Sequence, residues 1–124
     1  MQYLLLIYAS EQAQTEAWER LSEEEQGQEM RAWYSYTDEL QKAGAHVAGE
    51  ALQPTGTATT VRVRNGKIST TDGPYVETKE HLAGFYLVDV DSRERAIEIA
   101  GRIPEAAIGG IEVRPILTYS ALEM

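Results

Sequence analysis

The segment from Thr71 to Glu80 contains the residues of this chain whose types and spacing could do chemistry. It reads Thr-Asp-Gly-Pro-Tyr-Val-Glu-Thr-Lys-Glu. Asp72 and Glu77 are carboxylates, so that one could take up a proton as a base while the other donates one as an acid. Lys79 is an amine that could stabilise negative charge developing on a substrate. We therefore predict Asp72, Glu77 and Lys79 as candidate catalytic residues.

The backbone of this segment is predicted to form a stiff corner. Gly73 can adopt a positive φ, and Pro74 fixes its own φ and biases the preceding residue toward extended geometry. Gly73, Pro74, Tyr75 and the earlier Tyr8 are candidate ligand-binding residues, with the two tyrosines orienting the ligand. The alternative is a purely structural corner, in which Asp72 hydrogen-bonds the backbone just ahead of it.

A hairpin and a buried strand should position this corner. Residues 60–64 and 67–71 flank Asn65-Gly66, the dipeptide that most strongly favours a type I′ turn. Residues 83–90 form a run that is apolar on both faces, typical of a covered strand. The segment between the corner and this strand has two possible conformations. If it is extended, Glu77 and Lys79 lie on the same side, and if it is helical, Glu77 lies beside Glu80 and His81.

The rest of the chain supplies further strands and helices. Strands are expected at 2–8, which is also apolar on both faces, at 46–52 and at 111–117, where Pro115 indicates an edge or a bulge. A short helix is expected from Thr15. Helices are also expected from a Ser22 capping box to about Ala43, and from Asp91 to Pro104.

Hydrophobic periodicity predicts which helix faces are buried. In the long helix the expected stripe is Met30, Trp33, Tyr34, Thr37 and Leu40. In the last helix it is Ala96, Ile99, Ala100 and Ile103.

This order of elements predicts one α+β domain over residues 1–124, with a ferredoxin-like antiparallel sheet and its helices on one face. The strands at 2–8 and 83–90 are apolar on the second face too, and no element remains to cover it. A second copy, packed sheet against sheet about a two-fold axis, would cover that face, so we predict a homodimer.

Composition narrows the function classes. The chain has 11 basic and 20 acidic residues and a formal net charge of −9, which disfavours nucleic acid and anionic membranes as partners. No apolar run approaches the roughly 20 residues of a membrane span, and no signal peptide is indicated, so a cytoplasmic location is expected. No cofactor is predicted. No metal is predicted either, since cysteine is absent and a helical Glu77–His81 pair would supply only two ligands.

Four stretches of the sequence resemble the YCII-related superfamily, in the branch known for its DGPF motif. They are residues 3–8, 48–60, 71–79 and 84–90, so the resemblance runs nearly end to end. It implies a ferredoxin-like fold assembled as a dimeric α/β barrel. It implies no settled activity, although some relatives are linked with extracytoplasmic-function sigma factors.

The chain departs from the family pattern at two places. Tyr75 stands where the motif has Phe, which adds a hydroxyl. The His–Asp pair suggested for acid–base chemistry in the better-known YciI proteins is absent, and Trp33 and Ile103 stand near its positions. Activity inferred from that pair therefore does not transfer to this chain.

Two functions follow. The first is acid–base catalysis on a small cyclic or carbonyl-bearing metabolite, held in the concave space between sheet and helices. The second is a non-catalytic dimeric module that binds a metabolite or a protein such as a sigma factor.

Overall fold

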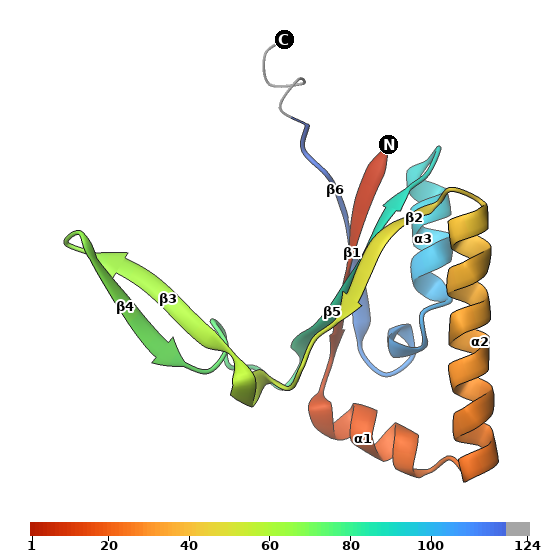
Figure 1. Cartoon of the computed structure of the whole chain (residues 1–124), viewed down its shortest axis with the longest axis horizontal. Coiled ribbons are helices and arrows are strands. Elements are labelled where there is room, and N and C mark those ends of the chain that lie inside the picture. Colours follow the sequence, from red (N-terminus) through yellow and green to blue (C-terminus); the bar gives the residue numbers. More distant parts are fainter. Residues whose placement is uncertain (119–124) are drawn as a thin grey trace.

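The computed structural model describes residues 1–118 and contains a four-stranded sheet, three helices and a separate hairpin (Figure 1). In chain order the strands and α-helices are β1 (Gln2–Ala9), α1 (Glu11–Glu19), α2 (Glu23–Lys42), β2 (His46–Ala51), β3 (Thr59–Arg64), β4 (Lys67–Asp72), β5 (His81–Asp89), α3 (Arg93–Gly101) and β6 (Gly110–Pro115). Two short 3₁₀ helices are η1 (Thr55–Thr57) and η2 (Pro104–Ala106).

The main sheet has the strand order β2-β5-β1-β6, and all three of its strand pairs are antiparallel. With the hairpin left aside, this order and the helix placement are compatible with the predicted ferredoxin-like plan. Figure 1 shows α2 and α3 on one side of the sheet. The α+β class is therefore confirmed, and β6 with its Pro115 is an edge strand, as predicted.

The core lies between the sheet and the helices. Alternate residues of β1 are buried, because successive side chains of a strand point to opposite faces. The largest fully buried side chains are Leu5, Leu40, Val88, Ile99 and Ile103. The predicted stripe of the last helix is confirmed, since its four residues are all 5% exposed or less.

The opposite face of the sheet has no covering element within residues 1–118. Leu4 and Leu6 of β1 and Phe85 and Leu87 of β5 point to this face, and all four are only half-buried. We call these four residues the open sheet face. The two strands thus carry apolar residues on both faces, as the sequence indicated.

Serine caps set where the helices begin. The predicted Ser22–Glu25 capping box is present, with Ser22 Oγ accepting from the Glu25 amide and the Glu25 carboxylate accepting from the Ser22 amide. The other two predicted starts were wrong. Ser10 caps α1, which begins at Glu11 and not at Thr15, and Ser92 caps α3 in place of Asp91. In both cases the serine hydroxyl accepts a hydrogen bond from the backbone amide three residues later in the chain.

The predicted stripe of α2 was partly wrong. Tyr34 is 65% exposed and Met30 is 44% exposed, whereas Tyr36, which lay outside the stripe, is 8% exposed. Trp33 and Leu40 do face the core. The buried side of the helix is therefore turned toward Tyr36, whose ring lies 4.0 Å from the guanidinium of Arg102 at the end of α3.

The hairpin of β3 and β4 has the predicted turn, and its register pairs Val63 with Ile68 and Arg64 with Lys67. Asn65 and Gly66 have φ values of 53° and 74°, as a type I′ turn requires. Figure 1 shows the hairpin projecting away from the main sheet on the side opposite the helices. Its apolar residues Val61, Val63 and Ile68 are between 59% and 76% exposed.

Within residues 1–118, no helix combines the length and the apolar character that crossing a membrane requires.

Candidate functional site

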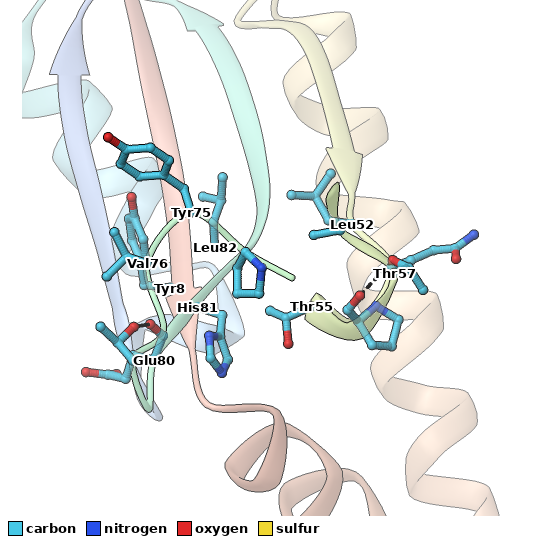
Figure 2. Close-up of a pocket in the computed structure, with 14 residues that line it drawn as sticks. Tyr8, Leu52, Thr55, Thr57, Tyr75, Val76, Glu80, His81 and Leu82 are labelled. Carbon is cyan, nitrogen blue, oxygen red and sulfur yellow. Dashed lines mark hydrogen bonds between the residues drawn. The ribbon is translucent and has the colours of Figure 1, made fainter. Parts of the chain in front are cut away.

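A cavity of about 670 Å³ lies beside the predicted corner, where β1 and β2 end and β5 begins. In Figure 2, Leu52, Thr55 and Thr57 lie on one side of it, and Tyr75, Val76 and Glu80 lie on the other. His81 and Leu82 lie between these two sides. We call this space the corner cavity. It lies within the range of volumes that small-molecule sites have.

The first wall is the turn from Leu52 to Ala58, which α1 holds in place. Glu11 Oε1 accepts hydrogen bonds from the Thr55 amide at 2.7 Å and from the Thr55 hydroxyl at 2.9 Å. The hydrogen bond from the Thr55 amide, and after it the one from the Thr55 hydroxyl, lowers the pKa of the Glu11 carboxyl below its ordinary value. Nearby His81 has a smaller effect in the same direction. The ionised Glu11 therefore fixes this wall.

Acidification is expected to release that wall. Because the pKa of Glu11 is lowered in the folded state, its stabilising effect is complete above the ordinary value of 4.5 and is lost as pH falls through the lowered value. The Thr55 amide resonance, followed by NMR, should shift in that acid range. In Glu11→Gln this titration should vanish. A Thr55 resonance that titrates equally in both proteins would contradict the assignment.

The second wall is the corner itself. Gly73 has a φ of 109°, which a residue with a side chain rarely adopts, so the predicted positive φ is confirmed. The Gly73 amide donates to the Ala58 carbonyl at 2.8 Å, and the Gly73 carbonyl accepts from the buried Thr60 hydroxyl at 2.9 Å. The corner is therefore held on both sides by the residues that lead into β3.

An aromatic ring follows the corner. Tyr75 is 74% exposed, and the guanidinium of Arg62 lies 5.2 Å from its ring centroid, within cation–π range. Arg62 thus bridges the hairpin and the corner.

His81 provides an unpaired polar atom in the cavity wall. Its Nδ1 is fully buried and has no hydrogen-bond partner among the described residues. A buried polar atom without a partner is costly, and such groups are rare in native proteins. Imidazole also changes charge near neutral pH more readily than other side chains. His81 is therefore the group of this cavity best suited to meet a polar ligand atom.

His81 was not predicted as a site residue. The apolar run of the next strand starts at Ala83, which predicts His81 to lie in the preceding loop, whereas β5 begins at His81 itself. Strand pairing places His81 opposite Ala9 and Leu82 opposite Tyr8, after an irregularity that leaves Ala83 of β5 without a pairing partner in β1. No local pattern in the sequence signals that pairing.

The predicted site residues divide into two groups. Tyr8, Pro74 and Tyr75 line the corner cavity, and Gly73 forms the backbone beside it. Asp72, Glu77 and Lys79 are exposed and are not among the lining residues. No hydrogen bond or ion pair of those three side chains is seen within residues 1–118. Their catalytic role stays a prediction.

The loop from 73 to 80 is neither helix nor extended strand. The helical arrangement that would place Glu77 beside His81 is therefore absent, and with it the two-ligand metal option. Among residues 1–118, no three His, Asp or Glu side chains are grouped as a metal site would require. The concave space between sheet and helices contains a different cavity, which none of the predicted site residues lines.

Comparison with known proteins agrees with the resemblance seen in the sequence. The family model of the YCII-related domain matches residues 1–120. An uncharacterised protein of Rhizobium meliloti (strain 1021) is 36% identical over 126 aligned residues, which cover 100% of this chain and 98% of that protein. Both matches extend over the corner, the strands and the cavity walls. The chain belongs to the YCII-related family.

Proposed function

We propose that this YCII-related domain binds a small metabolite in the corner cavity and carries out acid–base chemistry on it through His81. One observation carries the proposal, namely the fully buried Nδ1 of His81, which has no partner in the described structure. A ligand with a carbonyl or hydroxyl group would satisfy this atom once the imidazole turns Nδ1 toward the cavity. A histidine that contacts such a group can also exchange a proton with it near neutral pH.

The composition of the cavity indicates the class of metabolite. Leu52, Val76 and Leu82 supply apolar surface, and Tyr8 and Thr55 supply hydroxyl groups. Apolar walls with a few polar groups are typical of small-molecule sites, where the polar groups fix the orientation. The ligand we infer has a compact, cyclic apolar body with one carbonyl or hydroxyl group directed at His81.

The three predicted catalytic residues contribute to this proposal only if they can approach the ligand. Asp72, Glu77 and Lys79 lie outside the lining of the single chain. They would reach the ligand only if the loop closed over it, or if a second copy presented its corner to the cavity. Asp72→Asn and Glu77→Gln test this, because ligand binding or turnover would fall in these variants only if the carboxylates contact the ligand.

Two substitutions of His81 separate binding from catalysis. His81→Leu should weaken binding about 5- to 150-fold, the equivalent of the 1–3 kcal/mol lost when a buried polar group is left unpaired. His81→Asn should retain binding, because its amide can replace Nδ1 in a hydrogen bond, but should abolish turnover, since an amide does not titrate. Cyclic and carbonyl-bearing metabolites would be screened by thermal shift, and hits measured by calorimetry and product analysis.

The same substitutions predict an unusual effect on stability. Without ligand, His81→Leu should not lower the melting temperature and could raise it, because it removes an unpaired buried polar atom. His46→Leu, outside this cavity, is the matched control and should leave metabolite binding unchanged. Binding unaffected by His81→Leu, or a screen without a single hit, would overturn the proposal.

A non-catalytic binding module is the second candidate. The exposure of Asp72, Glu77 and Lys79 favours it, because none of these three side chains lines the corner cavity of the single chain. In that case ligands would bind without turnover, and the bound form would be read by a protein such as a sigma factor. Binding retained with no product formed by the parent protein would favour this candidate.

We also propose that two copies associate through the open sheet face as a dimeric α/β barrel. Four half-buried apolar side chains support this, since contiguous apolar surface of this kind marks interaction sites. Assignment to the DGPF branch and a cytoplasmic location stay predictions.

A further inference from the structure

A second cavity, of about 420 Å³, lies between α2 and the half of the sheet formed by β2 and β5. It shares only Leu52 with the corner cavity and contains neither His81 nor the corner. We call it the helix-face cavity. Nothing in the function proposed above uses it.

Aromatic rings form the floor of this cavity. Trp33 and Tyr86 stack with their ring centroids 5.3 Å apart and their planes 18° apart. The rings of His46 and Tyr86 meet edge to face, with their centroids 5.2 Å apart. The Tyr86 ring also lies so close to Gly49 that a β-carbon there would come within 2.2 Å of it. The rings are therefore held in position before any ligand arrives.

A carboxylate oxygen in this cavity has no partner. Glu105 Oε2 is fully buried, and no group of the described residues donates a hydrogen bond to it. Burial raises the pKa of the Tyr86 phenol, the Thr37 hydrogen bond opposes this, and the negative charge of Glu105 adds to the increase. The carboxylate thus lies near enough to the aromatic floor for its charge to act there.

The charges around this space have one sign. Glu50 and Glu105 line the cavity, and neither lysine nor arginine lines it within residues 1–118. An ionised carboxylate can only accept hydrogen bonds, and a buried one is costly without a positive partner. Aromatic faces attract cations as well. The missing component is a positively charged hydrogen-bond donor.

We propose that the helix-face cavity binds a small organic cation. Its ammonium group pairs with the Glu105 carboxylate, and its apolar or planar part lies on the rings of Trp33 and Tyr86. Gln14, Thr37 and Gln41 also line the cavity and supply neutral polar groups for the rest of the ligand. This site is independent of His81 and of the corner.

Three probes of one shape and different charge test the proposal on the full chain. Benzylamine is cationic at pH 7, benzyl alcohol is neutral and benzoate is anionic. Binding would be followed by Trp33 fluorescence in a Trp18→Phe background, because Trp18 is 42% exposed and lies outside the cavity. We expect saturable quenching by benzylamine, at least tenfold weaker binding of benzyl alcohol, and none of benzoate.

The isosteric variant Glu105→Gln tests whether the negative charge of Glu105 is what attracts the cation. This variant should weaken benzylamine binding at least tenfold and reduce the preference for benzylamine over benzyl alcohol. Glu29 is an exposed helix carboxylate outside the cavity, so Glu29→Gln should change neither the affinity for benzylamine nor that preference. The proposal is overturned if benzoate binds as tightly as benzylamine or if benzylamine causes no saturable change. Equal affinity of a folded Glu105→Gln variant for benzylamine would overturn it too. The comparison of probes on the parent chain decides the matter even if that variant fails to fold.

Discussion

Gly109→Ala is expected to destabilise the protein severely, whereas Gly110→Ala one residue later is expected to cost little. A β-carbon on Gly109 would lie 2.0 Å from the Tyr8 carbonyl oxygen and 2.9 Å from the Ala9 α-carbon. Both are backbone atoms of β1, so no side-chain rotation can relieve the clash. A β-carbon on Gly110 meets nothing within 4 Å.

The size of the effect follows from what must move. Overpacking in a core usually costs about 1–3 kcal/mol. Here the clash involves backbone, so β1 and the start of β6 must separate near Tyr8, and we expect a loss of at least about 3 kcal/mol, at the top of that range. Urea unfolding of the two variants measures the difference directly. Similar midpoints for Gly109→Ala and Gly110→Ala would show that β1 does not approach Gly109 so closely.

This prediction bears on function as well. Tyr8 lines the corner cavity and pairs with Leu82 on its other side. A backbone shift at Tyr8 would therefore distort the wall that holds His81 and Leu82. A Gly109→Ala protein that still folds should bind metabolites more weakly, although residue 109 does not line the cavity.

Leu6→Glu is expected to convert a dimer into monomers with little change in the stability of the fold. Leu6 lies in the centre of the open sheet face and is half-buried in the single chain, so a glutamate there remains hydrated in the monomer. In a sheet-to-sheet dimer, the two-fold symmetry would place two such carboxylates in the interface, where they would be buried without partners. Each 1.4 kcal/mol lost from the free energy of association raises the dissociation constant tenfold, so we expect the dissociation constant of the dimer to rise about a hundredfold or more.

The control for this prediction lies on the helical side. Ile97 of α3 is 44% exposed and faces away from the core, so Ile97→Glu adds the same charge outside the open sheet face. Sedimentation velocity over a range of concentrations should show a dimer for the parent and for Ile97→Glu, and a monomer for Leu6→Glu. A parent protein that sediments as a monomer at tens of micromolar would refute the dimer and the barrel.

Much of the fold could be predicted because its signals are local. The Asn65–Gly66 turn and the Ser22–Glu25 capping box depend on residues that are neighbours in the chain, and the structure contains both. Helix orientation is less local. Periodicity predicted that Tyr34 is buried, but the packing of α2 in the folded chain buries Tyr36 and leaves Tyr34 exposed.

The corner was predictable for the same reason, but its side chains were not. Gly73 and Pro74 restrict their own backbone, so the chain itself determines the bend. The direction of Asp72, Glu77 and Lys79 depends on an irregular loop, where no period of two or 3.6 residues assigns side chains to a face. The cavity beside that loop is built from three distant segments of the chain.

The amino-acid sequence by itself determined the class of fold, the hairpin, the corner and the two apolar faces of the central strands, since each depends on short-range pattern. Tertiary structure decided which polar atoms are buried without partners. His81 Nδ1 and Glu105 Oε2 became candidate ligand contacts only when strands and helices far apart in the chain closed around them. Burial is a property of the whole packed structure, and no residue's immediate neighbours in the sequence reveal it.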